Sequence, residues 1–524
     1  MNQKWRKTIC VILSILLCVS LCACGQDNFD EQSITLHTPE DIQSLDPQLA
    51  STKAELIAVA NCFEGLMVLD ADGNVTTGAA KNYQKDGMTY TFTLRDDMTW
   101  SDETTPVTAQ DFVFGLTRAL LPQTQAPMAS ALFCIENAQQ VYDGELSADQ
   151  LGVRAVDDMT LTVTLSTDRP DFLEILTYPV AMPCNSAFFD STNGRYGLDD
   201  DSLLTNGPFD LRVWNTEDDY LSLSRSGTYN GPNPAVPASV LLGFDREEKD
   251  INTNLQIGNV DIGYTDNTYT YTLTDAGFTC QSFYNTTYYL YLSDQLGGEN
   301  TGLYRALFYD IDSSLITANL PSYLKSATGF ISSDAAALGE NYREAAGALD
   351  LPDYDLQAAL DIVENTENAA NAFAGITLYY PDGNEDYKTI ANILAQKWQS
   401  DLNAYINTAA DSVSNIQANI ESGECVLAIL PVSSSDNRAN NQLLQFQSYQ
   451  ISGFEAAAIS ASDSTGDPYI QTLKETEQLL LDTEQFYPLF DEPVSCFVSA
   501  KTARVVLSNA GNYMLLKYVE KSEK

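Results

Sequence analysis

The sequence predicts an α/β protein with mixed sheets that folds as two lobes. Its 524 residues exceed the span of one domain, about 100–200 residues, and 44% of them are hydrophobic, which is enough for a sizeable core. Alternating strand patterns dominate the first half of the chain. From about residue 340, short buried strands alternate with helices. This change along the chain predicts two lobes of different construction.

The elements of the first half are predicted from apolar residues that recur every second residue in strands and every third or fourth residue in helices. At Thr108–Asp111, a threonine and an acidic side chain can accept hydrogen bonds from the free N–H groups of a helix start, and Pro122 ends that helix. We expect strands at 34–36, 90–94, 161–165 and 209–214, and helices at 54–68 and between Thr108 and Pro122.

The second half is predicted to contain buried strands and amphipathic helices. Residues 376–380 form a strand, and 387–398 place apolar side chains at helical spacing. Residues 426–430 are an uninterrupted apolar run, which is typical of a strand inside a parallel sheet. Strands return at 496–506.

The N-terminus combines basic residues with an apolar run. Lys4, Arg6 and Lys7 precede an apolar run at 9–23, which is shorter than the about 20 residues of a transmembrane helix. The run ends in Leu21-Cys22-Ala23-Cys24, similar to a lipobox. The resemblance implies a signal peptide at 1–23, lipid attachment at Cys24 and a polar tether over 24–33, so that the membrane is contacted through lipid. The alternative is a plain secretory signal in which Cys24 is incidental.

Composition excludes several classes of function. The 72 acidic residues outnumber the 27 Lys and Arg, and the net charge of −45 repels phosphate backbones, so we expect no nucleic-acid partner. The single histidine, His37, excludes sites that need two imidazoles, and we expect it to be a structural, hydrogen-bonded residue. No metal or cofactor motif is present, and we expect neither.

The remaining cysteines give no metal or redox spacing. Cys62, Cys134, Cys184, Cys280, Cys425 and Cys496 are scattered without a CxxC pair. An even number permits disulfides outside the cell, whereas the apolar surroundings of Cys62 and Cys425 are equally compatible with buried thiols. The pairing stays open.

Several blocks occur in order along the chain. They are SLDPQ (44–48), FEGLMVLDADG (63–73), YTFTLRDDMTWSDETTPVTAQDFVFGLTRAL (90–120), LGVRAVDDMTLTVTL (151–165), TNGPFDLRVW (205–214) and Asn512-Tyr513-Met514. Together they resemble the family 5 extracellular solute-binding proteins, the oligopeptide- and dipeptide-binding components of ABC importers. The resemblance is good over about 34–262 and weak over about 263–490.

This resemblance implies a periplasmic-binding-protein-like fold of type II in its large, three-subdomain form. Lobe I would combine 34–54, 155–265 and 490–524, with an inserted subdomain at 55–154, and lobe II would span 270–485. A ligand would lie in the cleft between the lobes and be enclosed as they close.

The sequence departs from the family at the expected cleft. Peptide-binding members place an acidic residue after a buried strand, where it pairs with the α-ammonium group of the peptide. Here that place falls near Ser433 and Ser434, and Asp436 follows two residues later. Either Asp436 takes this role or the segment is only a turn. Met128 stands where relatives often have an aromatic residue.

The family also places polar ligand contacts after the strand near residue 264. Tyr264, Asp266 and Asn267 offer a phenol, a carboxylate and an amide to a peptide backbone. The alternative is a tyrosine-rich strand that packs in the core.

The leading hypothesis is a monomeric, lipid-anchored receptor on the outer face of the cell membrane. It would capture oligopeptides and deliver them to the permease subunits of an ABC importer. Two alternatives remain: the same fold could bind a glycan, nickel chelate or heme, or act as a sensor, or the chain could be a secreted hydrolase with two carboxylates. Because no GxSxG motif or metal spacing is present, we do not expect an enzyme.

Overall fold

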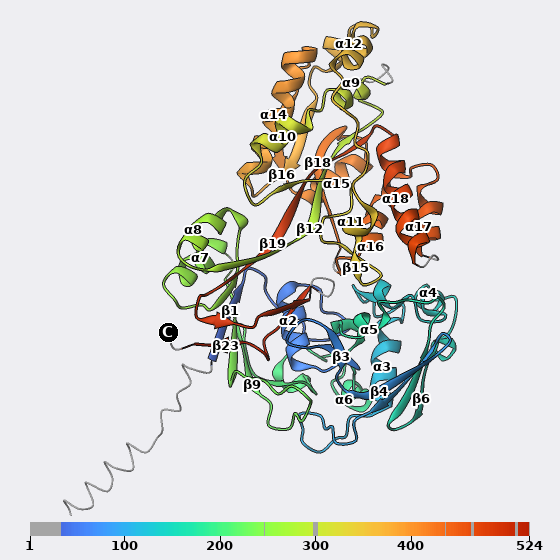
Figure 1. Cartoon of the computed structure of the whole chain (residues 1–524), viewed down its shortest axis with the longest axis vertical. Helices are drawn as coiled ribbons and strands as arrows, with labels where there is room; N and C mark the ends of the chain where they lie inside the picture. Colours follow the sequence, from blue (N-terminus) through green and yellow to red (C-terminus); the bar gives the residue numbers. More distant parts are fainter. Residues whose placement is uncertain are drawn as a thin grey trace, which may run out of the picture.

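The protein forms two halves joined by one large mixed sheet, which confirms the predicted fold class (Figure 1). The computed structural model describes residues 33–245, 247–296, 302–434, 436–462, 466–508 and 512–522. The predicted lipid-attachment residue Cys24 and the signal peptide lie outside these residues. Over the described residues, no helix has both the length and the apolar character needed to cross a bilayer.

The large sheet runs through both halves. Its strands, in spatial order, are β17 (Asn407–Asp411), β16 (Thr377–Pro381), β18 (Leu427–Ser433), β12 (Thr279–Leu292), β19 (Phe486–Val498), β11 (Ile262–Tyr264), β1 (Ser33–Thr38), β10 (Ser239–Phe244), β9 (Tyr220–Arg225) and β8 (Phe209–Asn215), with β13 (Lys325–Ser326) beside β19. β1 pairs in parallel with β10 and β11, and β16 pairs in parallel with β17 and β18, whereas the other neighbours are antiparallel.

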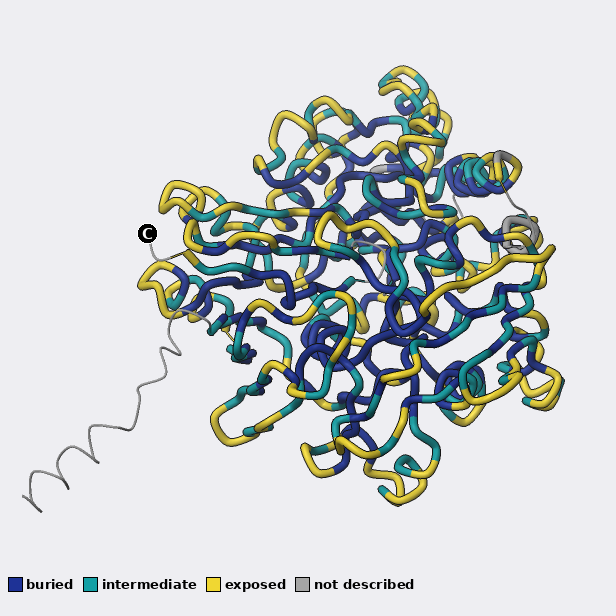
Figure 2. The backbone as a smooth tube through the Cα atoms, turned by 60° about the horizontal axis from the view of Figure 1, so that its bottom comes forward, coloured by how far each residue is buried: buried dark blue, intermediate teal, exposed yellow. Residues whose placement is uncertain are grey.

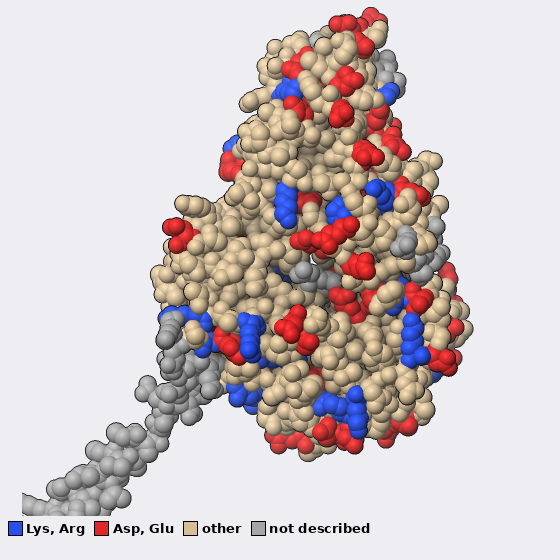
Figure 3. All heavy atoms as spheres, in the orientation of Figure 1, with Lys and Arg blue, Asp and Glu red and all other residues tan. Residues whose placement is uncertain are grey.

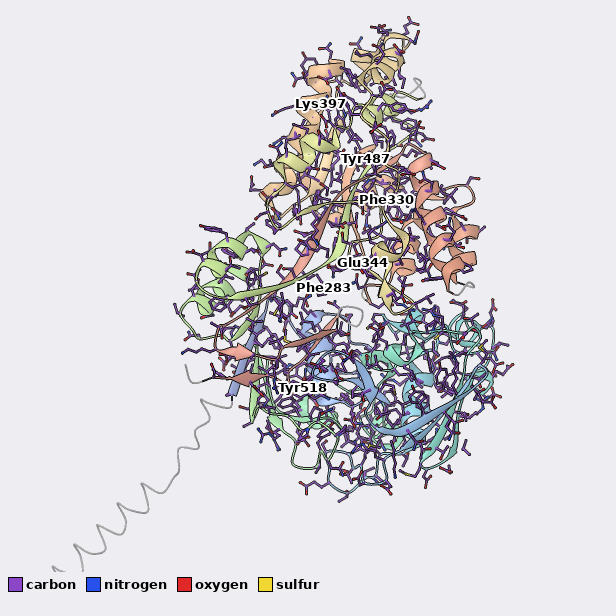
Figure 4. All side chains as sticks on the ribbon, in the orientation of Figure 1. Phe283, Phe330, Glu344, Lys397, Tyr487 and Tyr518 are labelled. Carbon is purple, nitrogen blue, oxygen red and sulfur yellow. The ribbon has the colours of Figure 1, made fainter. Side chains whose placement is uncertain are left out.

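The two longest strands connect the halves. β12 and β19 pair antiparallel from Thr279 opposite Val498 to Tyr291 opposite Phe486. In Figure 4, Phe283 on β12 lies between the halves, Phe330 and Tyr487 lie in the upper half, and Tyr518 lies in the lower half. The halves are therefore joined by a paired ribbon of backbone rather than by single flexible linkers.

The first half has its own core, which draws on residues from Ile34 to Tyr264 and again from Cys496 to Val519. A second sheet of four antiparallel strands packs here: β4 (Ala80–Asp86), β5 (Thr89–Leu94), β7 (Thr160–Thr164) and β6 (Val153–Asp157). The helices are α2 (Lys53–Cys62), α3 (Ala109–Ala119), α4 (Ala138–Tyr142), α5 (Phe172–Ile175), α6 (Ser186–Ser191), α7 (Glu248–Gln256) and α8 (Thr270–Asp275). The short strand pairs are β2 (Met67–Leu69) with β3 (Val75–Thr77), β20 (Thr502–Ala503) with β23 (Glu520–Lys521), and β21 (Val506–Ser508) with β22 (Tyr513–Leu515).

The second half has a separate core between Tyr288 and Phe490. Its helices are α9 (Tyr304–Tyr309), α10 (Ser313–Asn319), α11 (Tyr342–Ala346), α12 (Leu356–Glu364), α13 (Ala369–Ala372), α14 (Glu385–Leu402), α15 (Val413–Glu421), α16 (Ala439–Leu444), α17 (Phe454–Ser462) and α18 (Asp467–Asp482), and a small hairpin pairs β14 (Ala336–Ala337) with β15 (Glu340–Asn341). Figure 2 shows buried backbone in the interior of the molecule and exposed loops at its outside.

The polar residues of the sequence blocks hold the first half together. Arg118 of the 90–120 block forms a buried ion pair with Asp46 and donates a hydrogen bond from Nη1 to Gln48 Oε1 at 2.7 Å, which links it to the SLDPQ block. Arg95 pairs with Glu64 at 2.6 Å in the same way. These blocks therefore identify the scaffold of the fold rather than the ligand contacts.

The structure corrects two details of the predicted elements. The helix expected at 54–68 ends at Cys62, because the chain turns into β2 at Met67. The apolar run at 426–430 forms β18, which has a parallel neighbour on one side only and pairs antiparallel with β12 on the other. The strands expected over 496–506 are confirmed as the end of β19, β20 and the start of β21.

The six cysteines whose pairing the sequence left open form no disulfide bonds among the described residues. Cys62, Cys134, Cys184, Cys280, Cys425 and Cys496 are free thiols, and all except Cys280 are buried. His37 has the structural role that was expected, because its Nδ1 lies 2.6 Å from Asp245 Oδ2.

Candidate ligand-binding cleft

A cavity of about 280 Å³ lies between the two halves, and we call it the central cavity. The first half contributes Leu69, Gly73, Glu174, Leu507 and Ser508, and the second half contributes Asp334, Ala336, Gly339, Glu340 and Asn341. Figure 3 shows the hollow, with acidic side chains around it. Concave sites between two bodies of a protein are common places for ligand binding.

The central cavity is acidic. Its lining includes the carboxyl groups of Glu174, Asp334 and Glu340 and no lysine or arginine. Burial, together with the nearby charge of Asp171, raises the pKa of Glu174 to about 7. The carboxylate of Asp334 accepts a hydrogen bond from the backbone N–H of Tyr284 at 2.7 Å. The lining therefore favours a ligand group that is cationic or donates hydrogen bonds.

The predicted residues Ser433, Ser434 and Asp436 lie in the segment that leads from β18 to α16. Ser433 is the exposed last residue of β18, and Ser434 Oγ accepts a hydrogen bond from the N–H of Arg438 at 3.0 Å. Asp436 is only 1% exposed, and its Oδ2 accepts a hydrogen bond from Asn441 Nδ2 at 2.8 Å. Burial raises the pKa of Asp436 to about 6.

This segment lies against the segment of Met128, which belongs to the other half. Met128 is buried and directly precedes the short 3-10 helix Ala129–Leu132. Asn441 Nδ2 also donates to Ser130 Oγ at 3.0 Å, and Arg438 Nη2 donates to Asp171 Oδ2 at 2.6 Å. The two halves are therefore in contact beside the central cavity.

The predicted residues Tyr264, Asp266 and Asn267 form a separate group at the end of β11. Tyr264 is buried, and Asp266 Oδ1 accepts a hydrogen bond from Thr268 N at 2.7 Å. Asn267 Nδ2 donates to the carbonyl of Pro493 at 2.9 Å, whereas its Oδ1 is hidden from solvent and has no hydrogen-bond partner among the described residues. Asn267 thus has an unsatisfied acceptor, which is closed off from solvent in this structure.

Sequence reasoning missed Lys53 at this place. Its Nζ lies 4.8 Å from the centre of the Tyr264 ring, and the ion pairs of the described residues do not include it. Burial lowers the pKa of this ammonium group. A lysine at the first position of a helix gives no signal in the sequence that it will lie over a tyrosine more than 200 residues later.

The structure thus separates the seven predicted residues into two groups, and none of the seven lines the central cavity. Glu174, Asp334 and Glu340 were not predicted. Nothing in the sequence distinguishes them from the other acidic residues of the chain, because their meeting depends on how the halves close.

Comparisons with known proteins agree with this architecture. Residues 74–454 match the model of the bacterial extracellular solute-binding proteins, family 5 (middle region). The chain belongs to this family. The family match confirms the resemblance that the sequence blocks indicated. The members of this family are solute-binding proteins rather than enzymes.

Two curated relatives are similar over part of the chain. The periplasmic oligopeptide-binding protein OppA of Escherichia coli K12 is 34% identical over 237 residues, 44% of this chain and 43% of the relative. A probable deoxycholate-binding periplasmic protein, YgiS of the same organism, is 34% identical over 188 residues, 35% of each chain. The chain thus spans less than half the length of these relatives.

A solved structure shows the same fold over almost the whole chain. Haemophilus influenzae OppA in complex with the peptide RPPGFSPFR has a TM-score of 0.73 at 20% identity, covering 94% of this chain and 99% of that protein. The two proteins therefore share the two-half fold.

Proposed function

We propose that this chain is a receptor that captures oligopeptides between its two halves and delivers them to the permease of an ABC importer. The observation that carries the proposal is the acidic cavity between the halves of a family 5 binding protein. Its carboxyl groups suit the ammonium group or the basic side chains of a peptide.

The proposal also includes a lipid anchor and a monomeric state. Lipid attachment at Cys24 would hold the receptor on the outer face of the cell membrane, near the permease, and the protein would act as a monomer. The domain limits that we propose are 34–54, 155–265 and 490–524 for lobe I, 55–154 for its inserted subdomain and 270–485 for lobe II. The two separate cores support the division between lobe I and lobe II.

The binding residues that we propose are Asn267, whose Oδ1 has no hydrogen-bond partner among the described residues, and Asp436 with its neighbours Ser433 and Ser434. Met128, Tyr264 and Asp266 belong to the same proposed set. None of these residues lines the central cavity in this structure, so the proposal requires the ligand to extend beyond that cavity. Closing of the halves would exclude water and strengthen each hydrogen bond to the ligand.

Thermal unfolding tests the proposal. A ligand present at about 100 times its Kd adds about 2.7 kcal/mol to stability, so the purified protein is scanned against pools of peptides, amino acids and oligosaccharides. Stabilisation by peptides alone supports the proposal. Stabilisation by oligosaccharides alone, or conversion of a pool component into product, contradicts it.

A point variant tests the role of Asp436. If this carboxylate holds the peptide ammonium group, Asp436→Asn weakens the binding of trialanine at least about tenfold, whereas Asp72→Asn on an exposed turn leaves it unchanged. An unchanged Kd for Asp436→Asn removes the residue from the site.

A second candidate function is the binding of a non-peptide ligand by the same fold. The bonds of Asp436 to neighbouring side chains favour this alternative, because they leave the carboxylate less available to an ammonium group. Mass spectrometry of ligand that copurifies with the native protein distinguishes the two candidates.

A further inference from the structure

A second and larger cavity lies beside the contact between the halves, and we call it the lateral cavity. Its volume is about 890 Å³, within the range of small-molecule sites. One wall comes from residues 130–169 of the first half and the other from 438–469 of the second half. None of the seven predicted binding residues lines it, and it shares no lining residue with the central cavity.

The walls of the lateral cavity are rich in neutral hydrogen-bonding groups. Amide side chains come from both halves: Asn137, Gln139, Gln140, Asn440, Asn441 and Gln447. Phe133 and Tyr469 add aromatic surface. The only carboxylate in the lining is that of Glu136, which is exposed. These groups suit a ligand body with amide or hydroxyl groups.

Two buried guanidinium groups also line this cavity. Arg169 donates from Nε and Nη2 to the two oxygens of Asp171 at 2.9 and 2.8 Å, and Arg438 reaches the same carboxylate at 2.6 Å. Arg169 is 8% exposed and Arg438 is 7% exposed. Two guanidinium groups therefore pair with one carboxylate at the wall of the cavity.

This sharing is unusual for such an acidic chain. Among the ion pairs of the described residues, Asp171 is the only carboxylate that serves two cations, although acidic residues outnumber basic ones by 72 to 27. A planar guanidinium group with remaining N–H donors matches a carboxylate in geometry and charge.

We propose that the lateral cavity binds a small molecule that carries a carboxylate on a neutral body rich in amide or hydroxyl groups. The carboxylate contacts Arg169 and Arg438, and the body lies between the amide side chains of the two walls. Because both halves supply the walls, such a ligand stabilises their contact. The site is separate from the peptide cleft proposed above and does not depend on it.

Calorimetric titration of the purified full-length protein tests the charge requirement. N-acetyl-dialanine with a free carboxylate represents an acylated amino acid or a peptide C-terminus, and digalacturonate represents a sugar acid. We expect at least one of the two to bind, and we expect its uncharged partner, the C-terminal amide or the methyl ester, to bind at least about tenfold more weakly.

Two variants locate the binding site. Gln140→Trp and Gln447→Trp place a large side chain in the cavity, one from each wall. We expect each variant to lower the affinity for the carboxylate probe at least about tenfold. Gln445→Trp is the matched control, because Gln445 is an exposed glutamine in the same 3-10 helix, Gln445–Tyr449, and does not line the cavity. The control variant is expected to bind the probe as the parent does.

The outcomes separate the two sites. If the two tryptophan variants lose binding of N-acetyl-dialanine but still bind trialanine, the protein has two distinct sites. If they lose binding of N-acetyl-dialanine and the parent does not bind trialanine, the lateral site is supported and the peptide cleft is not. Equal affinity for the carboxylate and its uncharged partner, retained affinity in both tryptophan variants, or no saturable binding up to about 10 mM overturns the proposal.

Discussion

Asp436 and Asp491 are buried residues whose carboxyl groups have raised pKa values. Burial raises the pKa of Asp436 to about 6, and the same cause raises that of Asp491 to about 6. A carboxyl group whose folded pKa is raised binds its proton more tightly in the folded state, so its contribution to stability is lost as pH rises from its unfolded pKa through its folded pKa.

This relation gives a prediction for Asp436. Replacing it with asparagine removes the titration but keeps a side-chain oxygen for Asn441. The unfolding free energy of Asp436→Asn, relative to the parent, should therefore rise by about 2 kcal/mol between pH 4 and pH 7. Urea unfolding at several pH values measures the difference, with exposed Asp72→Asn as control. A difference that stays constant with pH would show that the Asp436 carboxylate is hydrated.

Close backbone packing gives a second prediction at this scale. A Cβ atom on Gly115 of α3 would lie 2.4 Å from the carbonyl oxygen of Met182. Gly115→Ala should lower the free energy of unfolding by about 1–3 kcal/mol, even though alanine favours helices. Gly227→Ala is the control, because no atom lies within 4 Å of its added Cβ. Equal urea midpoints for the two variants would contradict this packing argument.

At the scale of elements, the start of α2 depends on one carboxylate. Glu55 Oε1 accepts hydrogen bonds from the backbone N–H groups of Gln43 and Ser44 at 2.9 and 3.1 Å, and Oε2 accepts from Ser51 and Thr52 at 2.9 and 3.1 Å. Glu55 therefore ties the helix start to the loop that follows β1.

Replacing Glu55 with glutamine should be costly, because its NH2 group would face two N–H donors. We expect Glu55→Gln to lower the free energy of unfolding by about 2–3 kcal/mol. In Glu385→Gln, an exposed first-turn glutamate of α14 that pairs with Lys388, the loss should stay below about 1 kcal/mol. Chemical denaturation compares the two, and equal losses would show that the bonds of Glu55 are dispensable.

The elements were largely predictable because their signals are local. The capping pattern at Thr108 and Asp111 and the alternation at 90–94 correspond to α3 and β5. The end of α2 at Cys62 was missed because apolar residues continue at helical spacing into β2, where tertiary packing overrides the pattern. The candidate site was less predictable. Glu174 and Asp334 come from different halves, and no local pattern indicates that they meet.

At the scale of the whole molecule, the net charge of −45 sets the response to salt. Mutual repulsion of the acidic residues opposes the compact state, and screening shortens its range from about 30 Å at 10 mM salt to about 10 Å at 100 mM. The midpoint of thermal unfolding should therefore rise by several degrees over this range of NaCl. Sodium sulfate at matched ionic strength is the control, and a midpoint that falls with salt would contradict this.

The return of the chain to its starting point affects how the protein is made. The core that begins at Ile34 receives its last members from 496–519, and β11 finds its neighbour β19 only after the entire upper half has been synthesised. A polypeptide that is synthesised from the N-terminus onward cannot complete this core until nearly the whole chain is available. A chain threaded through a membrane would thus stay loosely folded during passage and acquire its final shape on the far side.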